Sequence, residues 1–220
     1  MGDILIYIPP NKIDYYCRPP LSSVRLQAQK IPGCRVGAAI VHEGILRKKN
    51  IYSGGWDIDK EEWERHHSYK RIEDIIDHIH DIKKSKTYED ARRSLHCHGV
   101  FKYKSIKCRD VDDLERLFDY MVSMIHSITR EGFDFSLTKD MPAAFVDRFG
   151  SVIKSGQASH RFSIAKLCAP EKPVPLYIRG VHSIYFNKCR CPRTTAFDGF
   201  VEIVSKVAKK SDGFVADVQI

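Results

Sequence analysis

The sequence predicts an α/β fold, of the α+β kind, in which a small mixed sheet carries a helical insert and a C-terminal extension. Apolar residues recur at helical spacing in the middle and near the end of the chain, whereas short β-rich runs alternate with turn signals elsewhere. The 220 residues, 43% of them hydrophobic, fit one globular unit with appendages and lack the composition of a disordered chain.

The first predicted strands are short and lie between turn signals. Asp3 to Ile8 alternates weakly and predicts a strand that Pro9-Pro10 ends. Val36 to Val41 predicts a second strand. Gly54-Gly55 then predicts a sharp turn of the backbone that presents the next two residues, a tryptophan and an aspartate.

The middle of the chain predicts three helices. Isoleucines at i, i+3, i+4, i+7 and i+10 form one apolar stripe from Ile72 to Ile82. A short helix is expected to start with Thr87 as N-cap and to end near Leu95. A longer helix should start at Asp110 and end at Gly132, with an apolar side formed by Leu114, Leu117, Phe118, Met121, Ile125 and Ile128.

The last third of the chain returns to strands before a final helix. Ala144 to Ile153 predicts two short strands joined by a turn at Phe149-Gly150. Pro173 to Val181 predicts another strand, which ends at His182. Phe200 to Val207 predicts an amphipathic helix that packs against the core.

Charge and hydropathy narrow the classes of partner. The formal net charge of +8 attracts phosphate-bearing ligands, from nucleotides to nucleic acids, although the charges are spread along the chain. Phe101-Lys102-Tyr103-Lys104 alternates aromatic and basic residues, which suits a nucleic-acid surface and equally an amphipathic edge strand. No apolar run approaches the ~20 residues that cross a bilayer, so we expect no membrane partner and a cytoplasmic location.

The seven cysteines predict reduced thiols, because their number is odd and the sequence shows no secretory signal. Cys189-Arg190-Cys191 is the one close pair, whereas structural zinc commonly needs two. His96-Cys97-His98 could complete a zinc site, but buried thiols and a polar loop are the simpler interpretation, and we expect no metal held by cysteine.

The most informative segment runs from Ser155 to Arg161 and predicts a phosphate-binding turn. A β-rich run ends before it and helical spacing begins after it, so unpaired N–H groups of a helix N-terminus would face a ligand. His160 and Arg161 add donors and a fixed positive charge. The alternative is a capped helix start, with Ser159 as N-cap and a solvated His-Arg pair. The expected ligand-binding residues here are Ser155, Gly156, Gln157, Ala158, Ser159, His160 and Arg161.

This turn resembles the G-x-His-Arg turn of the ParB/sulfiredoxin superfamily, which holds nucleotide phosphates. Tyr52 to Asp57 resembles the GG-D-W-D signature of an uncharacterised group in that superfamily, and Leu176 to His182 resembles its closing strand. The resemblance covers about residues 50 to 186. It implies a nucleotide-binding domain over 1–185 with a helical insert at about 61–132, an extension over 186–220, and Trp56 and His182 beside the nucleotide.

Two departures from the superfamily pattern narrow the expected chemistry. Its sulfinic-acid reductases place a catalytic cysteine where this chain has Ser159, so that reaction is not expected. Its kinase-like members usually have Asp-Gly where this chain has Gln157-Ala158, and alanine enters the positive-φ region less easily than glycine.

The resemblance implies ATP- or ADP-dependent transfer of a phosphoryl group to a small hydroxyl compound, with Mg²⁺. His160 would bind phosphate, Asp57 would act as a metal-linked or general-base carboxylate in the same pocket, and Glu43 is the reserve. Alternatively, Asp57 only caps the turn that follows it, and Arg148 is an exposed turn charge rather than a phosphate ligand. The other function classes are a non-catalytic nucleotide-sensing or nucleic-acid-associated module and a ParB-like nuclease.

Overall fold

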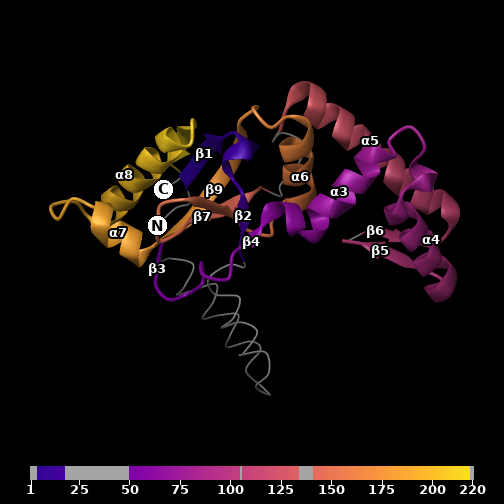
Figure 1. The fold of residues 1–220 in the computed structure, drawn as a ribbon, viewed down its shortest axis with the longest axis horizontal. Coiled ribbons are helices and arrows are strands. Elements are labelled where there is room, and N and C mark those ends of the chain that lie inside the picture. The colour runs from indigo at the N-terminus through magenta and orange to yellow at the C-terminus, as the bar shows by residue number, and fades with distance from the viewer. Residues whose placement is uncertain (1–3, 18–49, 105, 134–140, 219–220) are drawn as a thin grey trace, which may run out of the picture.

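The computed structural model describes residues 4–17, 50–104, 106–133 and 141–218, which form a mixed sheet with helices packed around it (Figure 1). The predicted α/β class is therefore confirmed. None of the helices in these ranges combines the length and the apolar character that a membrane span requires.

The described strands build one mixed sheet of eight strands and a separate two-stranded hairpin. Seven strands of the sheet follow the order β10-β1-β9-β7-β8-β2-β4, and β3 also pairs with β9. Their bounds are β1 Ile4–Ile8, β2 Tyr15–Tyr16, β3 Ile51–Tyr52, β4 Glu61–Glu62, β7 Ala143–Val146, β8 Val152–Lys154, β9 Val174–His182 and β10 Phe214–Val218.

Strand direction decides which segments meet at each edge of the sheet. Strands β3 and β7 both run parallel to β9, so the carboxyl ends of these three strands meet at one edge. Strand β8 runs antiparallel to β7, with Val146 opposite Val152. The residues that follow β8 therefore lie at the other end of the β7–β8 hairpin from its tight turn.

The segment between β4 and β7 is largely helical in the described residues. It comprises the short helix η3 Trp63–Arg65, α3 His67–Asp77, η4 Ile82–Lys84, α4 Lys86–His98, the hairpin of β5 Phe101–Tyr103 and β6 Ile106–Cys108, and α5 Val111–Glu131. After β8, the helix α6 (Ser159–Cys168) packs against α3 and α5. In Figure 1, α3 and α6 lie between the sheet and the part of the chain formed by α4, β5 and β6.

Side-chain caps fix where two of these helices begin. Asp110 caps α5 as predicted, because its carboxylate accepts the N–H of Asp113 at 2.7 Å. The predicted cap of α4 was wrong: Ser85 rather than Thr87 is the N-cap, and its hydroxyl accepts the N–H of Tyr88 at 3.1 Å. The N–H of Thr87 is bonded to Asp74 instead, at 2.7 Å.

The C-terminal part adds two helices and a strand to the sheet. Helices α7 (Ser183–Cys189) and α8 (Ala196–Lys210) follow β9, and β10 pairs with β1. Strand β9 and helix α8 match the predicted strand and helix, whereas α7 and β10 were not predicted. Figure 1 shows α7 and α8 at the opposite end of the sheet from α4.

Alternation along β7 and β8 separates two apolar clusters. Ala144, Val146 and Val152 join the main core with the apolar faces of the helices. Phe145 and Ile153 point to the other face of the sheet, where they pack with Cys17, Tyr52 and Trp56. The predicted strand at Val36 to Val41 lies outside the described residues.

Candidate functional site

The predicted phosphate-binding turn follows β8 at the open end of the β7–β8 hairpin. Ser155 anchors it, because its N–H and its hydroxyl both donate to the carbonyl oxygen of Ala143, at 2.9 Å each. Ala158 then adopts a φ of +52°, a left-handed conformation that costs a non-glycine residue ~1–2 kcal/mol. Helix α6 begins at the next residue, so Ala158 rather than Ser159 is its N-cap.

A buried lysine holds this turn from inside. Lys154 is 0% exposed, and its ammonium group donates to the carbonyl oxygens of Ser155, at 2.5 Å, and of Gln157. The same ammonium lies over the rings of Trp63 and Phe162, at 5.5 Å from each centroid. Lys154 thus positions two carbonyl groups of the turn, a role that its place at the end of a strand did not indicate.

The N-cap residue of α6 gives the helix no side-chain cap among the described residues. The N-cap residue is an alanine, and the hydroxyl of Ser159 donates to the carbonyl of Gly156 at 2.5 Å instead of accepting a helix N–H. The first-turn N–H groups of a helix carry a partial positive charge and need an acceptor. This helix start is therefore suited to an anion.

His160 is the unusual residue of this helix start. Its side chain is buried, at 8% exposure, and its ring meets the ring of Tyr103 edge-on, with centroids 5.2 Å apart. Both ring nitrogens are buried and lack a hydrogen-bond partner among the described residues. Burial, reinforced by the positive charges of Arg71 and Lys104 and by two histidines, lowers the pKa of His160 to about 3. The ring is therefore neutral at pH 7.

The second helix start at this place is that of α3. His66 is its N-cap and accepts the N–H of Ser68 through Nδ1 at 3.2 Å, while its ring stacks on Trp63 at 4.7 Å. Burial, followed by the charges of His67 and Lys154, lowers the pKa of His66 to about 4. The start of α3 lies close to α6, because the two helices pack together and the Nε1–H of Trp63, just before α3, donates to the hydroxyl of Ser163 in α6 at 3.2 Å.

Sequence reasoning missed this second helix start. His66, His67 and Arg71 were not among the predicted site residues. A signal was present, since a His-His-Ser sequence directly precedes a helix with a strong isoleucine stripe. What the sequence did not indicate is that this helix would pack beside α6.

Arg161, the last residue of the predicted turn, lies next to His160 but faces a different neighbour. Its guanidinium group is 5.5 Å from the centroid of the Phe133 ring, a cation–π contact across the end of α5. The side chain is half-buried. Arg161 therefore places a fixed positive charge beside the start of α6.

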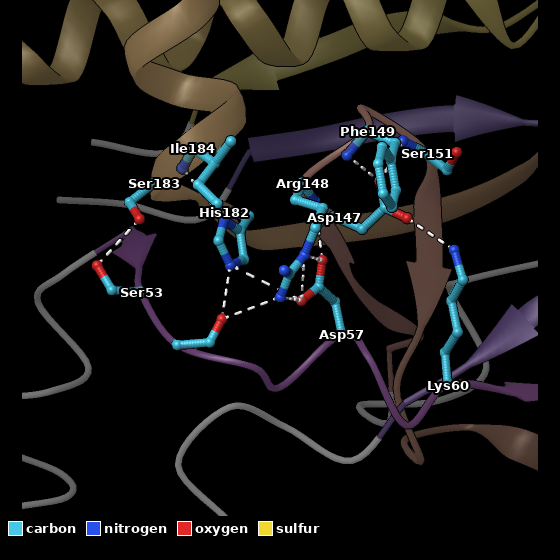
Figure 2. A network of polar contacts seen from close by, with 11 residues as sticks. Ser53, Asp57, Lys60, Asp147, Arg148, Phe149, Ser151, His182, Ser183 and Ile184 are labelled. Atoms are coloured by element: carbon cyan, nitrogen blue, oxygen red, sulfur yellow. Dashed lines mark hydrogen bonds and ion pairs between the residues drawn. The ribbon is translucent and has the colours of Figure 1, made fainter.

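Asp57, the predicted catalytic carboxylate, is enclosed in an ion pair at the opposite end of the hairpin (Figure 2). Its side chain is 1% exposed, and both of its oxygens accept hydrogen bonds from Arg148, including one of 2.6 Å from Nη2 and one of 2.9 Å from the backbone N–H. Burial by itself raises the pKa of Asp57, but the bonds from Arg148 and the nearby His182 outweigh it, so the pKa lies below its ordinary value. The prediction that Arg148 is merely an exposed turn charge was wrong.

His182 and Trp56 complete this second cluster. Nδ1 of His182 accepts the N–H of Ile184 at 3.1 Å, so its Nε2 carries the proton and donates to the carbonyl of Gly54 at 2.8 Å. Trp56 packs on the rings of Phe145 and His182, with both centroid distances at 5.7 Å. These contacts tie the loop after β3 to the carboxyl ends of β7 and β9, as Figure 2 shows for Asp57 and His182.

The two predicted halves of the site are therefore at opposite ends of the β7–β8 hairpin. Asp57, Trp56 and His182 gather at its tight turn, whereas Ser155 to His160 follow its open end. The expected juxtaposition of Asp57 and His160 in one pocket is not what this geometry gives. The reserve carboxylate, Glu43, lies outside the described residues.

None of the six cysteine side chains in the described ranges forms a hydrogen bond with either cluster of polar residues. The six cysteines in the described ranges are free thiols, and Cys17 and Cys108 are buried. Burial, with a smaller contribution from Asp57, raises the pKa of Cys17 to about 12. No group of three or more His, Cys, Asp or Glu side chains that could hold a metal ion occurs in the part of the chain that the structure describes.

Thiol labelling should follow this burial. With iodoacetamide at pH 8, we expect Cys97 and Cys191, which are exposed, to react in the folded protein, and Cys17 and Cys108 to react only after unfolding. Mass spectrometry of tryptic peptides from native and urea-treated samples measures the difference. Rapid native labelling of Cys17 would contradict the packing of this residue against Phe145 and Ile153.

Comparisons with protein-family models, with curated proteins and with solved structures found no match to this chain. The geometry of the residues therefore carries the functional argument.

Proposed function

We propose that this chain binds a nucleotide through its phosphates at the turn from Ser155 to Arg161. The observation that carries the proposal is His160, a buried ring with two unbonded nitrogens at an uncapped helix N-terminus. Leaving buried polar atoms without partners costs free energy, so such atoms commonly mark a place where a ligand supplies the partner. A phosphate oxygen is a fitting acceptor for the ring N–H and for the N–H groups of α6.

The charges around the ring favour an anion in particular. Among the groups that lower the pKa of His160, Arg71 and Lys104 carry fixed positive charges, whereas His66 is neutral at pH 7 because burial lowers its pKa to about 4. Two helix N-termini add their partial positive charges at the same place. A bound phosphate would offset the mutual repulsion of Arg71 and Lys104, whereas a neutral or cationic ligand would not.

Kinase-like transfer of the terminal phosphate to a small hydroxyl compound is the activity that we propose for the bound nucleotide, following the resemblance of the turn. Mg²⁺ would enter with the nucleotide, because phosphates and waters supply most of its ligands in such sites. Asp57 is not proposed as the base, since Arg148 occupies both of its oxygens. Release of ADP from ATP in the presence of glycerol, serine or ribose tests this activity separately from binding.

Thermal shift with a set of ligands tests the binding proposal. We expect ATP, ADP and inorganic pyrophosphate to raise the melting temperature, because a ligand that binds only the folded state stabilises it by mass action. Adenosine, which lacks phosphates, should produce a much smaller shift in the melting temperature. The shift measured with a single-stranded oligonucleotide separates nucleotide binding from nucleic-acid binding. Equal shifts with adenosine and ATP would count against recognition through the phosphates.

Arg161→Ala should weaken ATP binding about tenfold or more, the effect of losing one charge-assisted contact. Isothermal titration calorimetry on the folded variant measures the loss. Arg193→Ala removes the same charge from an exposed residue between α7 and α8 and serves as the matched control. An unchanged affinity in Arg161→Ala would remove Arg161 from the site.

A further inference from the structure

A cavity of about 150 Å³ lies within the helical segment and borders the start of α6 through Tyr103, whose ring also meets that of His160. Helices α3, α4 and α5 and strand β5 line it, on the right of Figure 1, and it is partly open to solvent. Its lining is mostly apolar and comprises Ala91, Phe101, Tyr103, Leu117, Phe118 and Met121, with Arg71, Thr87 and Asp90 as the polar members.

The size and the walls of the cavity suit a flat ring. A dry protein cavity of ~150 Å³ lined by apolar side chains binds one benzene molecule. Here three of the lining side chains are aromatic, and aromatic rings pack favourably edge-on or offset against another ring. Tyr103, one of these walls, is buried, and burial raises the pKa of its hydroxyl to about 12, so it remains neutral.

Arg71 gives the cavity its charge. Among the described residues, Arg71 takes part in no hydrogen bond or ion pair, although its charge acts on Tyr103 and His160. The other charged lining residue, Asp90, is half-exposed and already lies 3.1 Å from the ammonium group of Lys86. The charge left to meet a ligand is therefore positive, and the planar fork of a guanidinium group matches a carboxylate with two parallel hydrogen bonds.

We propose that this cavity binds a small aromatic carboxylate, with its ring between Tyr103 and Phe118 and its carboxylate on Arg71. The proposal concerns a ligand other than the nucleotide, although the charge of Arg71 acts at both places. It rests on two observations: the cavity offers an apolar space the size of one ring, and Arg71, which lines it, forms no ion pair with an acidic residue among the described residues.

Titration with benzoate tests the proposal, with benzyl alcohol as the uncharged ring of similar size. In wild type, we expect benzoate to shift the methyl NMR signals of Leu117 and Met121, and to bind at least ~10 times more tightly than benzyl alcohol. Arg71→Met should weaken benzoate about tenfold and leave benzyl alcohol unchanged. Arg93→Met, which removes an exposed arginine from the same helical segment, should leave both affinities unchanged.

Filling the cavity provides an independent check. Ala91→Met places a flexible side chain into the space and should abolish binding of both probes, and Met121→Trp serves if Ala91→Met does not fold. Benzoate binding that is equal in wild type and Arg71→Met, or that persists in the filled variant, would overturn the proposal. Absence of methyl shifts at millimolar benzoate, or tighter binding of phenyl phosphate than of benzoate, would overturn it as well.

Discussion

Replacing Arg148 by methionine is expected to lower the melting temperature by roughly 10 °C, the largest stability effect among the changes considered for this chain. The reason is that the substitution leaves the buried carboxylate of Asp57 without its partner. Asp57 is 1% exposed and receives its side-chain hydrogen bonds and its neutralising charge from Arg148. A buried ionised group that loses its partner is far less stable than the pair, whereas the methionine preserves most of the apolar stem of the arginine.

A double-mutant cycle separates the ion pair from the loss of packing. Arg148→Met combined with Asp57→Asn should cost clearly less than the sum of the two single variants, because the second change removes the charge that the first leaves unpaired. Arg93→Met, on an exposed face of α4, is the control for loss of an arginine. Additive effects in the cycle, measured by urea unfolding, would show that Asp57 and Arg148 do not stabilise each other.

The same pair predicts the response of the wild type to acid. The pKa of Asp57 in the folded protein lies below its ordinary value of 3.8, so the stabilisation is complete above that value and is lost as the pH falls through the folded pKa. Arg148→Met should lack this step in its unfolding free energy below about pH 4. Comparing the two proteins between pH 5 and pH 2 measures the difference.

The pair also shows where sequence reasoning stops. Gly54-Gly55 predicted a turn that presents Trp56 and Asp57, and the loop indeed closes over the carboxyl ends of β7 and β9. The partner of Asp57 lies 91 residues further along the chain, and no local pattern links the two. A carboxylate at a strand end suggests chemistry until its oxygens are shown to be occupied.

Elements with a local periodic signal were predicted well, whereas those fixed by tertiary pairing were not. The stripe of α5 and the Asp110 cap are local features, and both were correct. Strand β10 is defined by pairing with β1, and the start of α4 is defined by Asp74 as well as by Ser85. Small residues before the pair His160-Arg161 indicated the helix start. Nothing in the sequence indicated that the buried ammonium group of Lys154 would hold the carbonyl groups of the preceding turn.

Replacing His160 by phenylalanine is expected to weaken ATP binding about tenfold or more while the folded state is kept or made more stable. Phenylalanine preserves the flat ring that packs on Tyr103 and removes two buried nitrogens that lack partners. If His160 served only to pack the core, its replacement would lower the stability of the folded protein, and ATP binding would fall only because less protein is folded. Calorimetry with ATP and urea unfolding without ligand measure the two effects, and His126→Phe, on the exposed side of α5, is the control for affinity.

The stability of His160→Phe relative to wild type should also depend on pH in a defined direction. The pKa of His160 is about 3 in the folded protein against an ordinary 6.5, so the unfolded chain binds more protons between these values, and wild type loses stability as the pH falls below 6.5. Phenylalanine cannot take up that proton. The variant should therefore gain about 2 kcal/mol on wild type between pH 7 and pH 5. A relative stability that stays constant over this range would mean that the His160 ring is open to solvent, and the argument for a buried, unpartnered phosphate ligand would fail with it.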